Sequence, residues 1–147
     1  MTALPRVGTA QLMELLSVSL AAYYGDFTVA AASENLTASQ GKTLTVLRRG
    51  PASMSVLATT LTCDASNMTG IVGRLEKRGL VHREPSPSDR RVKNVVLTAE
   101  GERVVDVIRG KMRHTLDGLG RLDERERETL HTLLERVFAE QPPAGRP

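Results

Sequence analysis

The chain has 147 residues, of which 40% are hydrophobic, 25% are charged and only 3% are aromatic, with no tryptophan. This composition is ordinary for a soluble globular protein and excludes wholesale disorder, and the shortage of aromatic residues favours an aliphatic core of packed helices over a β-sandwich. The net charge is only +3, and a single cysteine excludes a disulfide framework or a cysteine-rich metal site.

Apolar residues at helical spacing, among them Leu12, Leu16 and Leu20, predict a first helix over residues 9–33. Thr37 and Gln40 then have the spacing of a capping box, in which each side chain satisfies a backbone amide at the start of a helix. We expect this second helix to end at Gly50-Pro51, because proline removes a backbone donor and glycine favours turns.

A short helix, a tight turn and a longer helix follow. Ser53 is placed to cap the short helix, and residues 62–64 form the turn, with Asp64 as the cap of the longer helix. The longer helix extends to about Arg78 with its apolar residues on one face, and Gly79 is a C-terminal stop.

Two short extended segments, residues 80–84 and 92–97, flank a turn-rich loop with two prolines and predict a β-hairpin. Thr98 can cap a fifth helix whose apolar residues continue as far as Leu116. Asp123 and Glu126 form another capping box, which opens a last helix, and Pro142-Pro143 ends it.

This order of elements predicts a mainly α fold, a winged helix-turn-helix with a small two-stranded β-wing and a helical dimerisation region. We expect the DNA-binding unit at residues 36–100 and the dimerisation region at 1–35 and 101–147, within one compact domain overall. The apolar spacing of the first and last two helices exceeds what a winged unit alone needs to cover.

The excess of positive charge is concentrated in one segment. Residues 74–93 contain seven basic and three acidic residues, a net of +4, which leaves −1 for the rest of the chain. A concentration of this kind is expected of a surface that binds phosphate, although a solvated charged face is the plainer alternative.

Several motifs resemble the MarR family (multiple antibiotic resistance regulators), and their order and spacing match the family better than any one of them does. They are, in chain order, Leu36–Gln40, Met54–Leu61, Ile71–Val81, Asp89–Arg91 and Leu97–Gly101. The resemblance implies a dimeric transcription regulator that binds double-stranded DNA as a homodimer at a near-palindromic operator. It also implies a small-molecule inducer that releases a repressor from its promoter.

Within this resemblance, the helix after the turn and the wing would bind DNA. Ser, Asn and Thr can contact base edges, and an arginine at a wing tip can enter a narrow minor groove, with Asp89 orienting Arg91. Ala65, Gly70 and Gly73 depart from the family pattern. Family members often carry longer polar residues at the positions of Ala65 and Gly70. The expected DNA-binding residues are Ser66, Asn67, Thr69, Arg74, Asp89, Arg90, Arg91 and Lys93.

A ligand site is expected where three of the four aromatic residues, Tyr23, Tyr24 and Phe27, lie near the end of the first helix. The resemblance implies a cleft between the dimerisation helices and the DNA-binding unit, which these residues could line. Ordinary core packing is an equal alternative.

Other functions are less consistent with the sequence. We expect neither an enzyme, a cofactor nor a metal site, because the chain has no nucleophile elbow or phosphate loop and its histidines lack ligand partners at suitable spacing. No apolar run approaches ~20 residues, and no signal peptide is evident, so we expect a cytoplasmic protein with no membrane partner. Two alternatives remain: a redox- or metal-responsive DNA-binding sensor, with Cys63 as the redox residue, and a winged-helix protein-interaction module.

Overall fold

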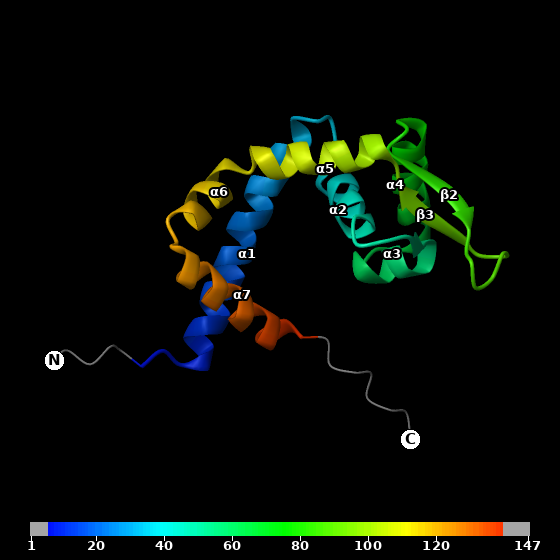
Figure 1. Ribbon diagram of the computed structural model, residues 1–147. Helices are drawn as coiled ribbons and strands as arrows, with labels where there is room; N and C mark the ends of the chain where they lie inside the picture. Colours follow the sequence, from blue (N-terminus) through cyan, green and yellow to red (C-terminus); the bar gives the residue numbers. More distant parts are fainter. Residues whose placement is uncertain (1–5, 140–147) are drawn as a thin grey trace, which may run out of the picture. The chain divides into compact units, whose positions relative to one another are not determined.

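The computed structural model describes residues 6–139, so the predicted stop at Pro142-Pro143 lies outside the described residues. The chain forms two compact units, one that ends at Met112 and one that begins at Arg113. The helices, shown in Figure 1, are α1 (Thr9–Ala32), α2 (Ala38–Leu47), α3 (Met54–Thr60), α4 (Ala65–Lys77), α5 (Ala99–Lys111), α6 (Arg113–Gly120) and α7 (Glu124–Phe138). The strands are β1 (Ala52–Ser53), β2 (Val81–Pro85) and β3 (Lys93–Leu97).

The helix starts predicted from capping residues are confirmed. The side chains of Thr37, Ser53, Asp64, Thr98 and Asp123 each accept a hydrogen bond from the backbone amide three residues later. Each cap satisfies an amide that the helix itself leaves without a partner, and so fixes where the helix begins.

Gly79 ends α4 as predicted. Its backbone has a φ of +69°, and the amide of Leu80 donates to the carbonyl of Leu75 at 3.1 Å, while that of Gly79 donates to Glu76 at 2.9 Å. This pair of bonds is a Schellman motif, which needs a left-handed residue at the position glycine occupies. The motif turns the chain directly from α4 into the wing.

The wing is one side of a three-stranded antiparallel sheet with the order β1-β3-β2. Val81 of β2 pairs with Leu97 of β3 and Pro85 pairs with Lys93, so the hairpin is in register over its whole length. The two-stranded wing was predicted, and β1 was not, because a two-residue strand is too short to show an alternating pattern. β1 pairs with β3 through Ala52 and Val95, and therefore ties the start of α3 to the wing.

The hydrophobic core belongs to the unit that ends at Met112. Apolar side chains of α1, α2, α3, α4, β3 and α5 meet there, and Leu44, Leu57, Met68, Leu75 and Val95 are fully buried. Only the C-terminal part of α1 contributes, through Phe27, Ala30 and Ala31. This core is aliphatic, as the composition predicted, and the winged helix-turn-helix fold is confirmed.

One predicted helix is in fact two. The expected fifth helix extended to Leu116, but α5 ends at Lys111 and a separate α6 begins at Arg113. Met112 between them has a ψ of 67°, which is not helical, and its side chain is buried in the core. A proline would have signalled such a break, but no proline is present here, so the apolar spacing alone continued the helix too far.

The prediction that no apolar run could span a membrane needs correction for α1. By length and composition alone, α1 is long and apolar enough to cross one. Its C-terminal residues, however, are packed into the core of the first unit, and most of its other apolar side chains, including Leu15 and Val18, are exposed. The face that these exposed residues form is therefore not covered by the described part of the chain.

Candidate nucleic-acid interface

The polar residues predicted to contact DNA lie on the outer face of α4. The opposite face, with Met68, Ile71, Val72 and Leu75, is buried in the core. Because the inner face is fixed by packing, the orientation of the outer face is fixed as well. Ser66, Asn67 and Thr69 all lie on the outer face and are exposed.

These three side chains differ in how much of their hydrogen-bonding capacity is already used. The hydroxyl of Ser66 donates to Asp64 at 2.9 Å, and that of Thr69 donates to the carbonyl of Ala65 at 2.9 Å. For the side-chain amide of Asn67, no hydrogen bond to any described residue is found. Asn67 is therefore the residue of this face whose donors and acceptor are both free for a base edge.

Asp64 fixes the start of α4 through its carboxylate. Its Oδ1 accepts from the amide of Asn67 at 2.7 Å and from the hydroxyl of Ser66 at 2.9 Å. These bonds, the Asn67 amide first, hold the pKa of Asp64 below its ordinary value, because both favour the ionised carboxylate. The first turn of α4 is thus anchored by a charged cap.

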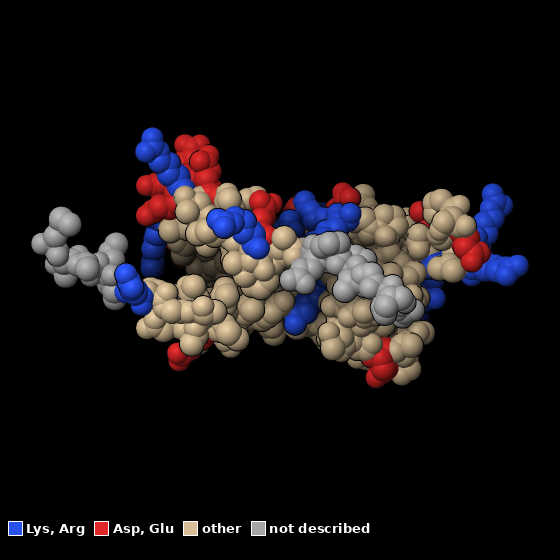
Figure 2. All heavy atoms as spheres, turned by 90° about the horizontal axis from the view of Figure 1, so that it is seen from below, with Lys and Arg blue, Asp and Glu red and all other residues tan. Residues whose placement is uncertain are grey.

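The wing loop is built by backbone contacts that leave its basic side chains outside. The amide of Ser86 donates to the carbonyl of Val92 at 2.8 Å, which closes the loop between β2 and β3. Arg90, Arg91 and Lys93 are exposed. Figure 2 shows Lys and Arg side chains projecting at the end of the molecule where Figure 1 places this loop.

The predicted contact between Asp89 and Arg91 exists in a different form. Asp89 Oδ1 accepts a hydrogen bond from the backbone amide of Arg91 at 3.0 Å, and not from its guanidinium. The carboxylate therefore shapes the loop, as aspartate side chains commonly do in turns, and leaves the guanidinium of Arg91 unpaired among the described residues.

The structure divides the seven basic residues of segment 74–93 into two groups. The guanidinium of Arg83 pairs with Glu76 at 3.3 Å, and that of Arg78 donates to two backbone carbonyls. For the other five, no ion pair or hydrogen bond of the charged group to a described residue is found. We call these five the unpaired cations: Arg74, Lys77, Arg90, Arg91 and Lys93. Lys77 was not among the residues predicted to bind DNA.

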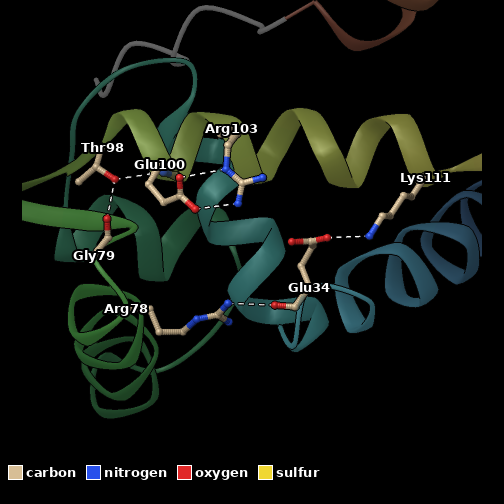
Figure 3. A network of polar contacts seen from close by, with 8 residues as sticks. Glu34, Arg78, Gly79, Thr98, Glu100, Arg103 and Lys111 are labelled. Carbon is tan, nitrogen blue, oxygen red and sulfur yellow. Dashed lines mark hydrogen bonds and ion pairs between the residues drawn. The ribbon is translucent and has the colours of Figure 1, made fainter.

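Arg78 holds the end of α4 against the turn between α1 and α2. Its Nη1 donates to the carbonyl of Asn35 at 2.9 Å. Its Nη2 donates to the carbonyl of Glu34 at 3.0 Å (Figure 3). The carboxylate of Glu34 in turn pairs with Lys111 of α5 at 2.7 Å. These contacts link three elements that are far apart in the sequence, so Arg78 acts within the fold and not as a free cation.

Thr98 joins the exit of α4 to the start of α5. Its hydroxyl donates to the carbonyl of Gly79 at 2.7 Å and accepts from the amide of Gly101 at 3.0 Å (Figure 3). Gly101 packs against Leu80: a Cβ added at Gly101 would lie 2.1 Å from the Leu80 carbonyl oxygen. The wing is therefore held close to α5 at a point that only glycine fits.

The three aromatic residues proposed for a ligand site do not share one environment. Tyr23 and Tyr24 are exposed, with their rings in edge contact at 5.5 Å between centroids. Phe27 is buried in the core, where a Cβ added at Gly41 of α2 would lie 3.0 Å from its Cζ atom. Lys42 of α2 lies over the ring of Tyr24, with Nζ 4.1 Å from the centroid. Sequence reasoning missed Lys42, because its proximity depends on how α2 packs against α1.

Cys63 is partly buried and packs against the core. Among the described residues, no group of three His, Cys, Asp or Glu side chains is placed to hold a metal ion.

Comparison with known proteins places this arrangement in a family. The sequence model of a protein family, described as "MarR family", matches residues 36–93, which include α4 and the wing. An HTH-type transcriptional repressor, IacR of Pseudomonas putida, is 36% identical over 93 residues, which make up 60% of this chain and 54% of the relative. The matching region thus spans only about half the length of the curated relatives.

Solved structures extend the likeness over most of the chain. A protein of Pseudomonas aeruginosa described as a probable transcriptional regulator is 30% identical, with a TM-score of 0.61 over 87% of this chain and 97% of its own. CouR of Rhodococcus jostii, solved with p-coumaroyl-CoA, is 26% identical, with a TM-score of 0.65 over 87% of this chain and 92% of its own. With its winged helix-turn-helix and these relatives, the chain belongs to the MarR family.

Proposed function

We propose that this protein is a dimeric, sequence-specific DNA-binding transcription regulator of the cytoplasm, and a ligand-responsive repressor. The observation that carries the proposal is the set of unpaired cations on α4 and the wing, beside the free side-chain amide of Asn67. Cations without an internal partner are available to phosphate, whereas Arg78 and Arg83 are already occupied. An enzymatic activity is not part of the proposal.

DNA binding is assigned to residues 36–100, and dimerisation to residues 1–35 and 101–147. In a two-fold dimer the two copies of α4 would enter successive major grooves about 34–36 Å apart, at a near-palindromic operator. Asn67 would read a base edge, with Ser66 and Thr69 beside it, while Arg90, Arg91 and Lys93 would contact the flanking backbone and minor groove. A dimer bound over a promoter blocks it.

The proposed inducer is an aromatic compound with an anionic group. Tyr23 and Tyr24 offer exposed rings, and Lys42 beside Tyr24 offers a cation for a carboxylate or a phosphate. The relative CouR was solved with p-coumaroyl-CoA, a ligand of this chemistry. Binding would favour a dimer conformation whose half-site spacing no longer fits the operator.

The experiment that tests DNA binding is a salt titration of affinity for genomic duplex fragments. If ~6–10 phosphates are contacted, affinity should fall about 10³–10⁵-fold between 50 and 200 mM salt. Lys93→Ala should weaken all sequences about equally and reduce the salt slope by about one for each phosphate that is no longer neutralised, whereas Arg91→Ala should act mainly at A·T-rich flanks.

The matched control is Arg103→Ala, which also removes one positive charge. Arg103 lies on α5, outside α4 and the wing hairpin, and its charged group is already paired with Glu100 at 2.7 Å (Figure 3). The Arg103→Ala variant should leave the salt dependence of DNA affinity unchanged. A flat salt response of the unmodified protein would contradict the proposed function and favour the protein-interaction module.

A further inference from the structure

Arg74 and Gly70 lie one helical turn apart on the outer face of α4, and their side chains share one space. A Cβ added at Gly70 would lie 3.5 Å from Arg74 Nη2, 3.7 Å from Nη1 and 3.9 Å from Cζ. The guanidinium of Arg74 therefore lies over Gly70. This direction is expected, because helical side chains point back toward the N-terminus of their helix.

The charged group of Arg74 has no partner among the described residues. This sets it apart from Arg78, four residues later, whose two terminal nitrogens donate to carbonyls. The carboxylate of Glu76, the acidic residue within α4, pairs with Arg83. All five N–H donors of Arg74 are thus available, and their position is shifted toward the N-terminal half of α4, the part that reaches base edges in helix-turn-helix proteins.

We propose that Arg74 reads a guanine in each half-site, and that Gly70 is the residue that makes this reading geometry accessible. A guanidinium presents two parallel donors that match the O6 and N7 acceptors of guanine in the major groove. Gly70 adds no side chain of its own, so the guanidinium can occupy the space over the helix at this position. The proposal rests on the proposed DNA-binding function and names the base that this site would select.

The competing role for Arg74 is a phosphate contact, which would carry no sequence information. The two roles differ in a measurable way. Loss of a phosphate contact weakens every sequence alike, whereas loss of a guanine contact removes the preference at one base pair and leaves the others unchanged.

The test is to select preferred sequences from a random duplex pool with the full-length protein, and then measure affinities for operators altered at single positions. Arg74→Ala should lose preference for one G·C pair in each half-site by about tenfold to a hundredfold. Arg74→Lys keeps the charge but not the paired donors, and should lose the same preference while retaining more overall affinity. Lys77→Ala, the matched control on the same helix, should weaken all operators alike.

Gly70 provides a second and independent arm. Gly70→Ala places a Cβ at ordinary contact distance from the guanidinium, so the guanine preference should persist. Gly70→Leu fills the space that the guanidinium occupies, and should remove the preference at the same base pair as Arg74→Ala. Circular dichroism and gel filtration of each variant establish that it is folded and has the same oligomeric state as the unmodified protein.

The outcomes separate this inference from the proposed function. If the unmodified protein selects no DNA, the proposed function fails. If it selects an operator, but Arg74→Ala and Arg74→Lys keep every base preference and differ only by a uniform loss of affinity, Arg74 contacts phosphate and the inference is overturned. Persistence of the preference in a folded Gly70→Leu variant would overturn the role given to Gly70.

Discussion

The helices α4 and α1 both show apolar residues at helical spacing, but they bury them differently. In α4 the apolar residues Met68, Ile71, Val72 and Leu75 are buried within the chain, and the opposite face is polar. In α1 the apolar residues cover most of the circumference, and Leu15 and Val18 are more than 60% exposed. Apolar spacing thus identifies a helix with a face to bury, but not the chain that covers it.

The largest expected effect comes from the face of α1 that is left uncovered. The double variant Leu15→Asp/Val18→Asp should be a monomer of about 16.0 kDa in light scattering, because two carboxylates would be buried in the proposed dimer interface. Its operator affinity should fall by ~10²–10⁴, since the second half-site then binds without the benefit of the first.

Val56→Asp is the matched control for this prediction, because Val56 is also an exposed valine but lies on α3 of the winged region. It should remain a dimer. A dimeric double variant would show that the exposed face of α1 is not the interface, and the comparison between α1 and α4 would lose its explanation.

The next largest effect tests how tightly the winged region is packed by its own chain. Gly101→Ala should lower the free energy of unfolding by about 1–3 kcal/mol in urea denaturation, because the new methyl would lie 2.1 Å from the Leu80 carbonyl oxygen and 2.7 Å from Leu97 Cδ1. Gly110→Ala, on the same helix with open space around it, should instead stabilise by about 0.5–1 kcal/mol. Equal effects at both glycines would contradict the close approach of wing and α5.

Features set by neighbours in the sequence were predicted well. Caps such as Thr37 and Asp64 satisfy amides three residues away, so both partners are visible in one short segment. The left-handed turn at Gly79 is local for the same reason. The order of such local elements was sufficient to predict the winged helix-turn-helix.

Features that depend on packing between distant segments were predicted poorly. The carbonyl partners of Arg78 lie 43 and 44 residues away, so nothing in its neighbourhood distinguishes it from the unpaired Arg74. The burial of Phe27 beside the exposed Tyr23 and Tyr24 likewise depends on where α2 packs. Residue types therefore indicated the surface of the candidate site, and tertiary contacts decide which of its side chains are free.

A smaller effect on stability should distinguish two arginines: the unpaired Arg74 on α4 and the hydrogen-bonded Arg78 directly after it. Arg78→Ala should lower the free energy of unfolding by about 1 kcal/mol, because it leaves the carbonyls of Glu34 and Asn35 without their donor. Arg74→Ala should change stability by less than about 0.5 kcal/mol, as expected of an unpaired surface residue. Urea denaturation measures both, and a larger loss for Arg74→Ala would mean that its guanidinium has a structural partner.

The smallest expected effect is a pH dependence at the start of α4. The pKa of Asp64 is lowered in the folded state by the amide of Asn67 and then by the hydroxyl of Ser66. A lowered carboxyl pKa means that the unfolded chain binds the proton more tightly, so the stabilisation is fully present near neutral pH. It is lost as the pH falls below the ordinary carboxyl range through the folded-state pKa.

Asp64→Asn keeps a capping oxygen without an ionisable group, and Asp64→Ser does the same with a hydroxyl. In urea denaturation at pH 6 and at pH 3, the stability of the unmodified protein relative to either variant should therefore decrease at the lower pH. If the difference in stability between the unmodified protein and each variant is the same at pH 6 and at pH 3, the carboxylate does not cap α4 in solution. The buried face of this helix alone then holds it in place.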